Sequence, residues 1–516
     1  MSPVLPLSPS PRLLRSPLLL ITLLAFWLRL PGLFGNSFHA DEALFATWAR
    51  YIATWRDPLL LTQAVDKPPL LFYLQAPFYL YPVLGPAEMA GRMPNFIASI
   101  LLVPLVGVWG WRLYGGWITA VLPSLLLALS PLAIQFSATA FTDPLMVFWL
   151  VAAGGRWQVA GGRSLSTGHR PLATGLLFGL AVATKYQAWL FLPLLVGLGW
   201  LNGWRWREWG RFALGLLPVL ALLLAWDVAR TGGFSLWAAQ MGNYGGLRLI
   251  WSWELWPRFT GWLALAQTLF AAPLWSLLAL TALLWPFFQK NGTRIHTDEH
   301  GFLLHNSQFA IRNSQFLSLF TLAYLLLHWF LAIPVWDRYL LPLLPIIAVL
   351  LGGMVNGQWS IVNRQLLMVN GQRERVVRVA FFVISSLLIV NLFSSALAAR
   401  NGRFPIGGSP QADGGAGQVA ALLYDAPYGA VLYDHWYSWQ WHYHLFWRRV
   451  HISWVPHPDA LAEDLRVFGG DGSPRYIVLP RDGRARPFQR AVSEAGFRLV
   501  PVDGAEAATM QLYRIE

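Results

Sequence analysis

The sequence predicts an all-α polytopic membrane bundle followed by a small C-terminal α/β domain, and three observations lead to this fold class. Only 12% of the 516 residues are charged and 56% are hydrophobic, whereas about 25% of the residues of a soluble domain are charged. The 29 Trp, 31 Phe and 16 Tyr residues suit a protein anchored at two membrane interfaces. Long apolar runs fill the chain as far as residue 399, and the sequence after it is polar and mixed.

The apolar runs predict about eleven transmembrane helices, because a helix needs roughly 20 apolar residues to cross about 30 Å of hydrocarbon. The runs lie at 16–34, 92–111, 116–135, 144–160, 171–184, 186–201, 212–229, 259–287, 315–333, 339–355 and 379–399. The first run follows Arg12 and Arg15, as the apolar core of a signal peptide would. Because no small-residue cleavage site follows it and further apolar runs do, we expect a retained first helix.

Positive charges give the expected orientation, since cytoplasmic loops carry an excess of Lys and Arg. With a cytoplasmic N-terminus, the inner segments hold Arg12, Arg15, Arg112, Arg156, Arg163, Arg170, Arg205, Arg207, Arg211, Lys290, Arg294, Arg312, Arg364, Arg373, Arg375 and Arg378. An odd number of spans then makes the C-terminal domain extracytoplasmic, in a multi-pass protein of the plasma or inner membrane. The net charge of +13 therefore needs no nucleic-acid partner. The absence of Cys excludes disulfides, thiolate metal sites and a Cys nucleophile.

We expect two domains, a membrane domain over residues 1–399 and a C-terminal α/β domain over 400–516. The second begins with a Gly-rich polar segment, Gly407–Gly417, whose composition is typical of a flexible linker. Short apolar runs that alternate with helical patterns indicate the α/β class. The expected strands include Ala430–Tyr433 and Tyr476–Leu479, and the expected helices include Ala460–Phe468 and Pro487–Ala495.

The first outer loop, residues 35–91, holds the first candidate site residues. A connection of this length is usually functional, and its apolar stretches predict helices that lie along the membrane interface. It opens with His39-Ala40-Asp41-Glu42 and continues to Asp66-Lys67. Two interpretations of Asp41 stay open, because an acid at a helix N-terminus complements the helix dipole without any catalytic role.

Six ionisable residues fall at outer helix ends on six different segments, which weakens the capping interpretation. They are Asp41, Lys67, Arg92, Asp143, Lys185 and Arg338. Ionisable groups at membrane depth are costly and usually mark a site. Cations gathered there would bind phosphate, and a carboxylate could accept a proton from a nucleophile. For Asp143, capping of the next helix also stays open, with Pro144 in the first turn of that helix.

A series of motifs follows the expected spans in order. They are His39-Ala40-Asp41-Glu42, Asp66-Lys67-Pro68-Pro69, Gly91-Arg92-Met93-Pro94, Leu129-Ser130-Pro131, Phe141-Thr142-Asp143-Pro144, Ala183-Thr184-Lys185 and Asp337-Arg338-Tyr339-Leu340-Leu341-Pro342. In order and placement, over residues 16–355, the chain resembles the ArnT-like and protein O-mannosyltransferase group of integral membrane glycosyltransferases, families 39 and 83. The resemblance implies the GT-C fold and an inverting transfer of a hexosyl or pentosyl unit from a polyprenyl-phosphate donor. The acceptor would be a lipid, a protein or a glycan on the outer face.

The resemblance also implies roles for individual residues. Asp41 maps to the catalytic base of such enzymes, and Asp143 maps to the acid that positions the acceptor or a metal. The cations that would grip the donor phosphate as the leaving group are Lys67, Lys185 and Arg338. The supporting residues are Glu42 as a second acid, Asp66, Arg92, His39 and Tyr339.

Alternatives stay open for several of these residues. Arg92 could instead pair with Asp41 or Asp66 as part of the scaffold, and a lone loop histidine such as His39 is more often a hydrogen-bonding surface residue than a ligand. Asp41 and Asp143 allow a divalent cation such as Mg²⁺ or Mn²⁺ without requiring one. After Lys185 the sequence departs from the pattern of the group, in which Gly-Pro is common at the positions of Tyr186-Gln187.

Two aromatic segments have weaker functional signals. The outer segment Gly232–Pro257, which contains Trp237, Tyr244, Trp251, Trp253 and Trp256, predicts an interfacial aromatic belt, with stacking on a sugar as the alternative. In the C-terminal domain, His442 and His444 alternate as on the face of a strand, which allows a metal pair. A packed aromatic strand or an acceptor contact is the preferred interpretation.

Three classes of function are compared. The first is the lipid-linked-sugar-dependent glycosyltransferase, whose partners are the donor, the acceptor and membrane lipids. A transporter or flippase of lipid-linked sugars is the alternative, but it should show internal repeats and polar groups at mid-membrane, and the sequence shows no such repeat. A membrane scaffold gives no reason for six ionisable residues to gather on one face.

Overall fold

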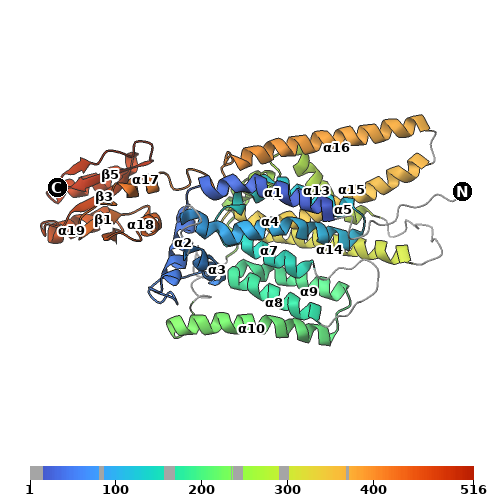
Figure 1. Cartoon of the computed structure of the whole chain (residues 1–516), viewed down its shortest axis with the longest axis horizontal. Coiled ribbons are helices and arrows are strands. Elements are labelled where there is room, and N and C mark those ends of the chain that lie inside the picture. Colours follow the sequence, from blue (N-terminus) through green and yellow to red (C-terminus); the bar gives the residue numbers. More distant parts are fainter. Residues whose placement is uncertain are drawn as a thin grey trace.

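The structure, a computed structural model, describes residues 15–80, 87–155, 169–233, 235, 248–289, 302–367 and 371–516. Figure 1 shows an elongated molecule in which a helical bundle fills one end and a small sheet domain the other. The predicted class, a mostly helical chain with a small C-terminal α/β domain, is therefore confirmed.

The helices of the bundle run mainly along the long axis of the molecule (Figure 1). In chain order as far as residue 231, the helices are α1 (Arg15–Gly35), α2 (Ala40–Ala53), α3 (Leu70–Tyr79), α4 (Ala87–Tyr114), α5 (Ile118–Leu129), α6 (Pro131–Ser137), α7 (Asp143–Gly154), α8 (His169–Thr184), η2 (Tyr186–Phe191), α9 (Leu192–Leu201) and α10 (Trp206–Thr231). The helices that follow, between residues 252 and 400, are η4 (Ser252–Glu254), α12 (Leu255–Gln267), α13 (Pro273–Phe288), α14 (Phe302–Phe330), η5 (Asp337–Leu340), α15 (Leu343–Leu367) and α16 (Gly371–Arg400).

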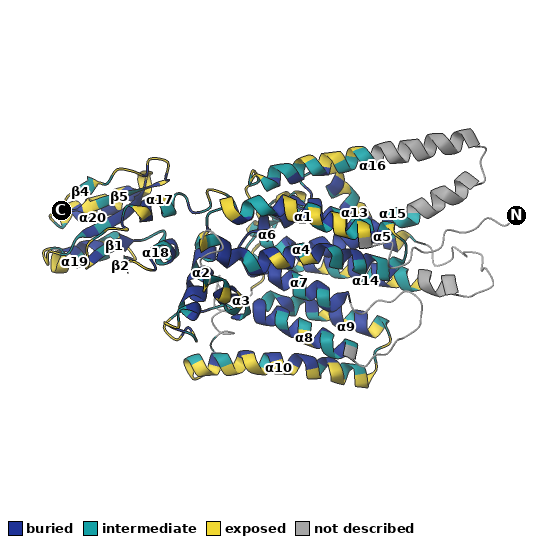
Figure 2. Ribbon diagram, in the orientation of Figure 1, coloured by how far each residue is buried: buried dark blue, intermediate teal, exposed yellow. Residues whose placement is uncertain are grey.

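Among the described residues, α1, α4 and α10 are each long and apolar enough to cross a membrane, and α5 with α6 would form a fourth, bent span. Figure 2 shows exposed residues along α10, and they include Leu214, Leu217 and Leu222. An exposed apolar face of this kind suits contact with lipid. The protein is a membrane protein, and the number of about eleven spans stays a prediction.

Two of the predicted spans are broken helices. The run 116–135 forms α5 and α6, which are bent by 62°, because the Ser130 hydroxyl caps α6 and Pro131 occupies its first position. The run 259–287 forms α12 and α13 rather than one helix. Here Ala271 has a φ of +49° and Pro273 begins α13; the residue before a proline avoids the helical region.

The first loop, 35–91, contains helices as predicted, and α2 and α3 pack against each other. The Trp48 ring of α2 lies 4.9 Å from the Phe72 ring of α3, and both residues are fully buried. The C-terminal end of α10 holds the loop between α2 and α3, since Arg230 donates to the carbonyl oxygens of Leu60 (3.2 Å) and Gln63 (3.1 Å).

The C-terminal domain is a five-stranded sheet in the order β2-β1-β3-β5-β4. β1 is parallel to both β2 and β3, and the edge formed by β5 and β4 is antiparallel. The strands are β1 (Ala430–Asp434), β2 (Val450–Trp454), β3 (Arg475–Pro480), β4 (Leu499–Pro501) and β5 (Met510–Ile515), and the helices are α17 (Ala416–Ala421), α18 (Ser438–His444), α19 (Pro458–Phe468), η6 (Gly483–Ala485) and α20 (Arg486–Glu494). The strands expected near 430 and 476 are β1 and β3, and the two expected helices are α19 and α20.

The sheet has a core on each face, as the two-residue period of a strand requires. On β1, Leu432 packs into one buried cluster and Tyr433 into the other. On β3, Val478 and Ile477 divide in the same way. Two packed faces explain why short apolar runs in a polar tail form an α/β fold.

Two expectations for the tail are wrong. His442 and His444 lie on α18 and not on a strand; residues two apart on a helix point about 200° apart, so they do not form a metal pair. The Gly407–Gly417 segment is not a free linker, because the Gln135 side chain donates to the carbonyl oxygens of Phe404 (3.1 Å) and Gly408 (3.1 Å). These bonds join the start of the tail to α6.

Candidate active site

Asp41 and Arg338 form an ion pair between α2 and η5. The Asp41 Oδ2 atom accepts a hydrogen bond from the Arg338 guanidinium at 3.0 Å, and the Asp41 side chain is 39% exposed. The cap of α2 comes from other residues, since His39 Nδ1 accepts from the Asp41 backbone N–H at 3.2 Å. The Asp41 carboxylate nevertheless lies in the first turn of α2, so the interpretation in which it complements the helix dipole stays open beside the ion pair.

Asp143 and Lys185 form a second ion pair, between the start of α7 and the connection after α8. The Lys185 ammonium donates to Asp143 Oδ1 at 2.5 Å, and Asp143 is only 1% exposed. The other oxygen, Oδ2, is buried without a hydrogen-bond partner among the described residues. Thr142 is the N-cap of α7 but makes no side-chain capping bond. Side-chain capping is thus not what holds Asp143.

The two ion pairs lie close enough together for both carboxylates to act on Arg338. Burial acts to lower the pKa of the Arg338 guanidinium, but the carboxylates of Asp143 and Asp41 outweigh it and raise that pKa overall. Burial lowers the pKa of Lys185 to about 8, with Asp143 opposing the shift and Arg338 and Lys67 adding to it. Two acids and three cations therefore share one region at the tail-facing end of the bundle.

Two of the cations, Lys185 and Arg338, make cation–π contacts with aromatic rings. The Lys185 ammonium lies 4.8 Å from the centre of the Tyr339 ring. The Arg338 guanidinium lies over the rings of Trp336 at 4.1 Å and Phe141 at 4.9 Å. Such contacts stabilise a desolvated cation, and Tyr339 thus lies where a supporting residue was predicted.

Lys67 lies on the loop before α3 and is paired with Asp66 by a direct contact of the ammonium with the carboxylate. Its side chain is 16% exposed. The loop is fixed from behind, because the Tyr73 hydroxyl donates to the Pro58 carbonyl at 2.7 Å. Lys67 is thus a third cation of the region, beside its own carboxylate rather than beside Asp41 or Asp143.

Glu42, Arg92 and His39 make contacts that hold the first loop in place. Glu42 is fully buried and accepts hydrogen bonds from the backbone N–H groups of His39 (3.0 Å) and Ala140 (2.7 Å). Burial raises its pKa, opposed by Arg92 and these bonds. Arg92 pairs with Glu42 at 3.9 Å, and not with Asp41 or Asp66, because α4 places Arg92 behind α2.

Three polar residues that support the site were given no role from the sequence. Asn95 donates to the carbonyl oxygens of Thr139 (2.7 Å) and Phe141 (2.6 Å), which fixes the segment that leads to Asp143. Asp337 accepts from the backbone N–H groups of Arg338 and of Gly407 at 3.1 Å. The third is Gln135 of α6. A polar residue inside an apolar run was the available signal for Asn95 and Gln135.

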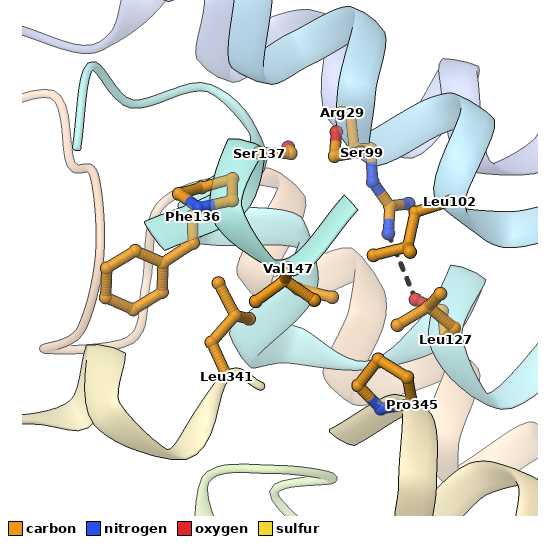
Figure 3. Close-up of a pocket in the computed structure, with 11 residues that line it drawn as sticks. Arg29, Ser99, Leu102, Leu127, Phe136, Ser137, Val147, Leu341 and Pro345 are labelled. Carbon is orange, nitrogen blue, oxygen red and sulfur yellow. Dashed lines mark hydrogen bonds between the residues drawn. The ribbon is translucent and has the colours of Figure 1, made fainter. Parts of the chain in front are cut away.

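A small cavity lies next to the site, lined by Pro144 and by Arg29, Ser99 and Ser137 (Figure 3). Its volume of about 20 Å³ suits about one water molecule and no sugar. Arg29 donates to the carbonyl oxygens of Leu127 and Ala128 at the end of α5. The cavity therefore belongs to the packing around the α5–α6 bend and not to a substrate site.

The donor set at the site fits an anion better than a divalent cation. Within the described ranges no three His, Asp or Glu side chains come together as a metal would require. Asp41 and Asp143 each face a cation already, whereas Mg²⁺ prefers several oxygen ligands around it.

The aromatic segment before α12 lies at the surface. Trp251, Trp253 and Trp256 are exposed, and the rings of Trp251 and Trp253 stack at 5.4 Å. Trp237 and Tyr244 lie outside the described residues. The interfacial belt stays the preferred interpretation of this segment.

Comparison with solved structures shows the fold of the chain. It resembles ArnT from Cupriavidus metallidurans in the apo state with a TM-score of 0.63 and 15% identity, over 96% of this chain and 97% of ArnT. The same enzyme bound to undecaprenyl phosphate gives a TM-score of 0.61 at 14% identity, over 98% and 97% of the two chains. The Archaeoglobus fulgidus oligosaccharyltransferase tethered with an acceptor peptide gives 0.55 at 14% identity, over 94% of this chain and 71% of that one.

The GT-C fold implied by the sequence motifs is therefore confirmed along almost the whole chain. Neither the family models nor the curated proteins compared with the sequence match it. At identities of 14–15%, the likeness extends to the fold and not to the substrates.

Proposed function

We propose that the protein is a glycosyltransferase that moves a hexosyl or pentosyl unit from a polyprenyl-phosphate donor to a hydroxyl acceptor. The observation that carries the proposal is the presence of two ion pairs, Asp41–Arg338 and Asp143–Lys185. The carboxylates of both pairs act on the Arg338 guanidinium. The fold supports it, since ArnT has been solved with undecaprenyl phosphate and the archaeal oligosaccharyltransferase with dolichol-phosphate. The acceptor is a lipid, a protein or a glycan.

The cations bind the phosphate of the donor. Lys185 and Arg338 face carboxylates, so an incoming phosphate competes with these carboxylates for the two cations. Lys67 extends the cationic region toward the first loop. Fixed cations at the phosphate stabilise the charge that develops on the leaving group.

Asp41 acts as the general base. The acceptor hydroxyl oxygen attacks the anomeric carbon, the bond from that carbon to the phosphate oxygen breaks, and polyprenyl phosphate leaves with the electron pair. The hydroxyl proton passes to the Asp41 carboxylate, which is exposed enough for an acceptor to reach. A single displacement from the face opposite the phosphate inverts the anomeric centre.

Asp143 positions the acceptor. Its Oδ2 atom is buried and without a partner among the residues that the structure describes, and an unsatisfied buried acceptor favours any ligand that donates a hydrogen bond to it. Lys185 keeps the same side chain in place through Oδ1. Asp143 is thus the group that would select a hydroxyl- or amine-bearing acceptor.

The orientation proposed for the protein follows from this site. The N-terminus is cytoplasmic, and the membrane domain (1–399) carries the site on its outer face. The C-terminal domain (400–516) is extracytoplasmic in the plasma or inner membrane. Arg230 at the C-terminal end of α10 contacts the first loop, so Arg205 and Arg207 at the other end of α10 lie away from the site, where positive charge is expected.

The test compares Asp41→Asn and Asp143→Asn in membranes supplied with polyprenyl-phosphate sugars. We expect Asp41→Asn to lower the transfer rate by about 10²–10⁴-fold, the usual contribution of a general base. Asp143→Asn should raise the acceptor KM together with a fall in kcat. Full transfer by both folded variants would contradict the assignment, and movement of lipid-linked sugar without chemical transfer would favour a flippase.

A further inference from the structure

The C-terminal domain packs on the helix that carries Asp41. In Figure 1 α18 lies beside α2, and the contacts between them are specific. Arg50 of α2 donates to the Tyr443 carbonyl at 2.6 Å, and its guanidinium lies 3.9 Å from the centre of the Tyr443 ring. The Tyr51 and Phe446 rings meet edge to face at 5.2 Å. This interface is well packed and charge-assisted.

Tyr443 belongs to a small buried cluster that is separate from the main core. Its other members are Phe38, Ala43, Ala46 and Ala140. Tyr443 is 1% exposed, and its ring meets that of Phe38 at 4.9 Å. Ala43 and Ala46 are small and lie one turn apart on α2, so the ring of Tyr443 can approach the helix closely.

This cluster joins the two segments that carry the acids of the site. Ala43 lies two residues after Asp41 on the first turns of α2. Ala140 lies three residues before Asp143, and its backbone N–H donates to Glu42 at 2.7 Å. The cluster therefore contains a tail residue together with residues of both acid-bearing segments.

We propose that Tyr443 and Arg50 are positioning residues, through which the C-terminal domain holds Asp41 and Asp143 in register for transfer. The inference rests on the proposed function of the two acids. The tail is thereby part of the catalytic unit and not only an appended domain. Without the contacts of Tyr443 and Arg50, α2 can shift against the 138–143 segment. A displacement of about 1 Å can lower the rate on the order of a hundredfold.

The experiment uses the full chain in lipid nanodiscs and compares Tyr443→Ala, Tyr443→Phe, Arg50→Lys and a control. Tyr443→Ala removes the ring but keeps the backbone carbonyl that Arg50 binds. Tyr443→Phe keeps the ring. Arg50→Lys keeps the charge but loses the planar guanidinium that stacks on the ring and donates to the carbonyl.

The matched control is Arg448→Ala. Arg448 lies over the Tyr424 ring at 4.3 Å and donates to the Tyr424 carbonyl at 3.3 Å. These are the same kinds of contact that Arg50 makes, but both partners lie within the tail. The control therefore removes an arginine with the same kinds of contact without touching α2, although Arg448 is exposed and Arg50 is buried.

Three readouts are taken: hydrogen exchange of the backbone amides of residues 40–53, binding of undecaprenyl phosphate, and turnover in the transfer assay. For Tyr443→Ala and Arg50→Lys we expect at least tenfold faster exchange, binding within twofold of wild type and at least tenfold lower kcat. Tyr443→Phe and Arg448→Ala should stay within twofold in all three. Wild-type turnover in Tyr443→Ala, or a fall in donor binding as large as the fall in kcat, would overturn the positioning role.

Failure of the inference can be told from failure of the proposed function. If Asp41→Asn also retains transfer, the proposed function has failed, while the exchange data still report whether the tail holds α2. If Asp41→Asn is inactive but Arg50→Lys transfers normally, the positioning role alone is wrong. If Tyr443→Ala does not fold, Arg50→Lys decides, since it removes no ring and leaves no cavity.

Discussion

Replacing Lys185 with methionine should destabilise the protein as well as inactivate it. The Asp143 carboxylate is 1% exposed, and Lys185 donates to its Oδ1 atom at 2.5 Å. Its Oδ2 atom already lacks a partner in the described part of the chain. Removal of one partner of a buried ion pair costs about 3–5 kcal/mol. Because Arg338 still acts on Asp143, we expect the lower end, about 3 kcal/mol.

The double variant Asp143→Leu/Lys185→Met separates stability from activity. Replacement of a whole buried pair by apolar residues is neutral or stabilising by about 1–4 kcal/mol, so the double variant should regain wild-type stability. Its transfer activity should stay as low as that of Lys185→Met, because the phosphate cation and the acceptor-positioning acid are both absent.

The assay is a double-mutant cycle of denaturation midpoints in identical nanodiscs, run beside the transfer assay. A Lys185→Met variant as stable as the wild type would refute the reasoning, since Asp143 would then not depend on its cation. The same conclusion would follow if the double variant were less stable than either single variant.

Three further predictions concern the same region. Burial lowers the pKa of Lys185 to about 8, so the positive charge of Lys185 is present below pH 8 and lost above it. Binding of undecaprenyl phosphate should therefore weaken as the pH rises through about 8. The Lys185→Arg variant should keep binding undecaprenyl phosphate to a much higher pH. Glu42→Gln should lower the stability by about 3–5 kcal/mol, since it removes the carboxylate that faces the fully buried Arg92. Asp41→Asn, at a carboxylate that is 39% exposed, should leave thermal unfolding nearly unchanged. Gln135→Leu should raise hydrogen exchange at residues 404–408, to which it is bonded, and an unchanged exchange rate there would contradict its anchoring role.

Sequence patterns predicted the helical class, the places of most helices and the residues that gather at one end of the bundle. They did so because hydrophobic period and charge at helix ends are local properties. The strands β1 and β3 were found for the same reason. The motif order added roles for Asp41, Asp143, Lys185 and Arg338, and the structure pairs these four residues.

What escaped prediction depends on contacts between distant segments. The Gln135 side chain donates to a backbone carbonyl about 270 residues later in the chain, and no local sequence pattern predicts such a hydrogen bond. The choice of Glu42 as the partner of Arg92 follows from how α4 packs behind α2. The short segment around His442 was assigned to the wrong period, because seven aromatic and polar residues fit a strand or a helix equally well.

The most direct measurement is a structure of the protein with undecaprenyl phosphate bound in nanodiscs. The account predicts the phosphate within hydrogen-bond distance of Lys185 and Arg338, with Asp41 released toward the acceptor side. A phosphate bound elsewhere, with both the Asp41–Arg338 and the Asp143–Lys185 pairs intact, would contradict it.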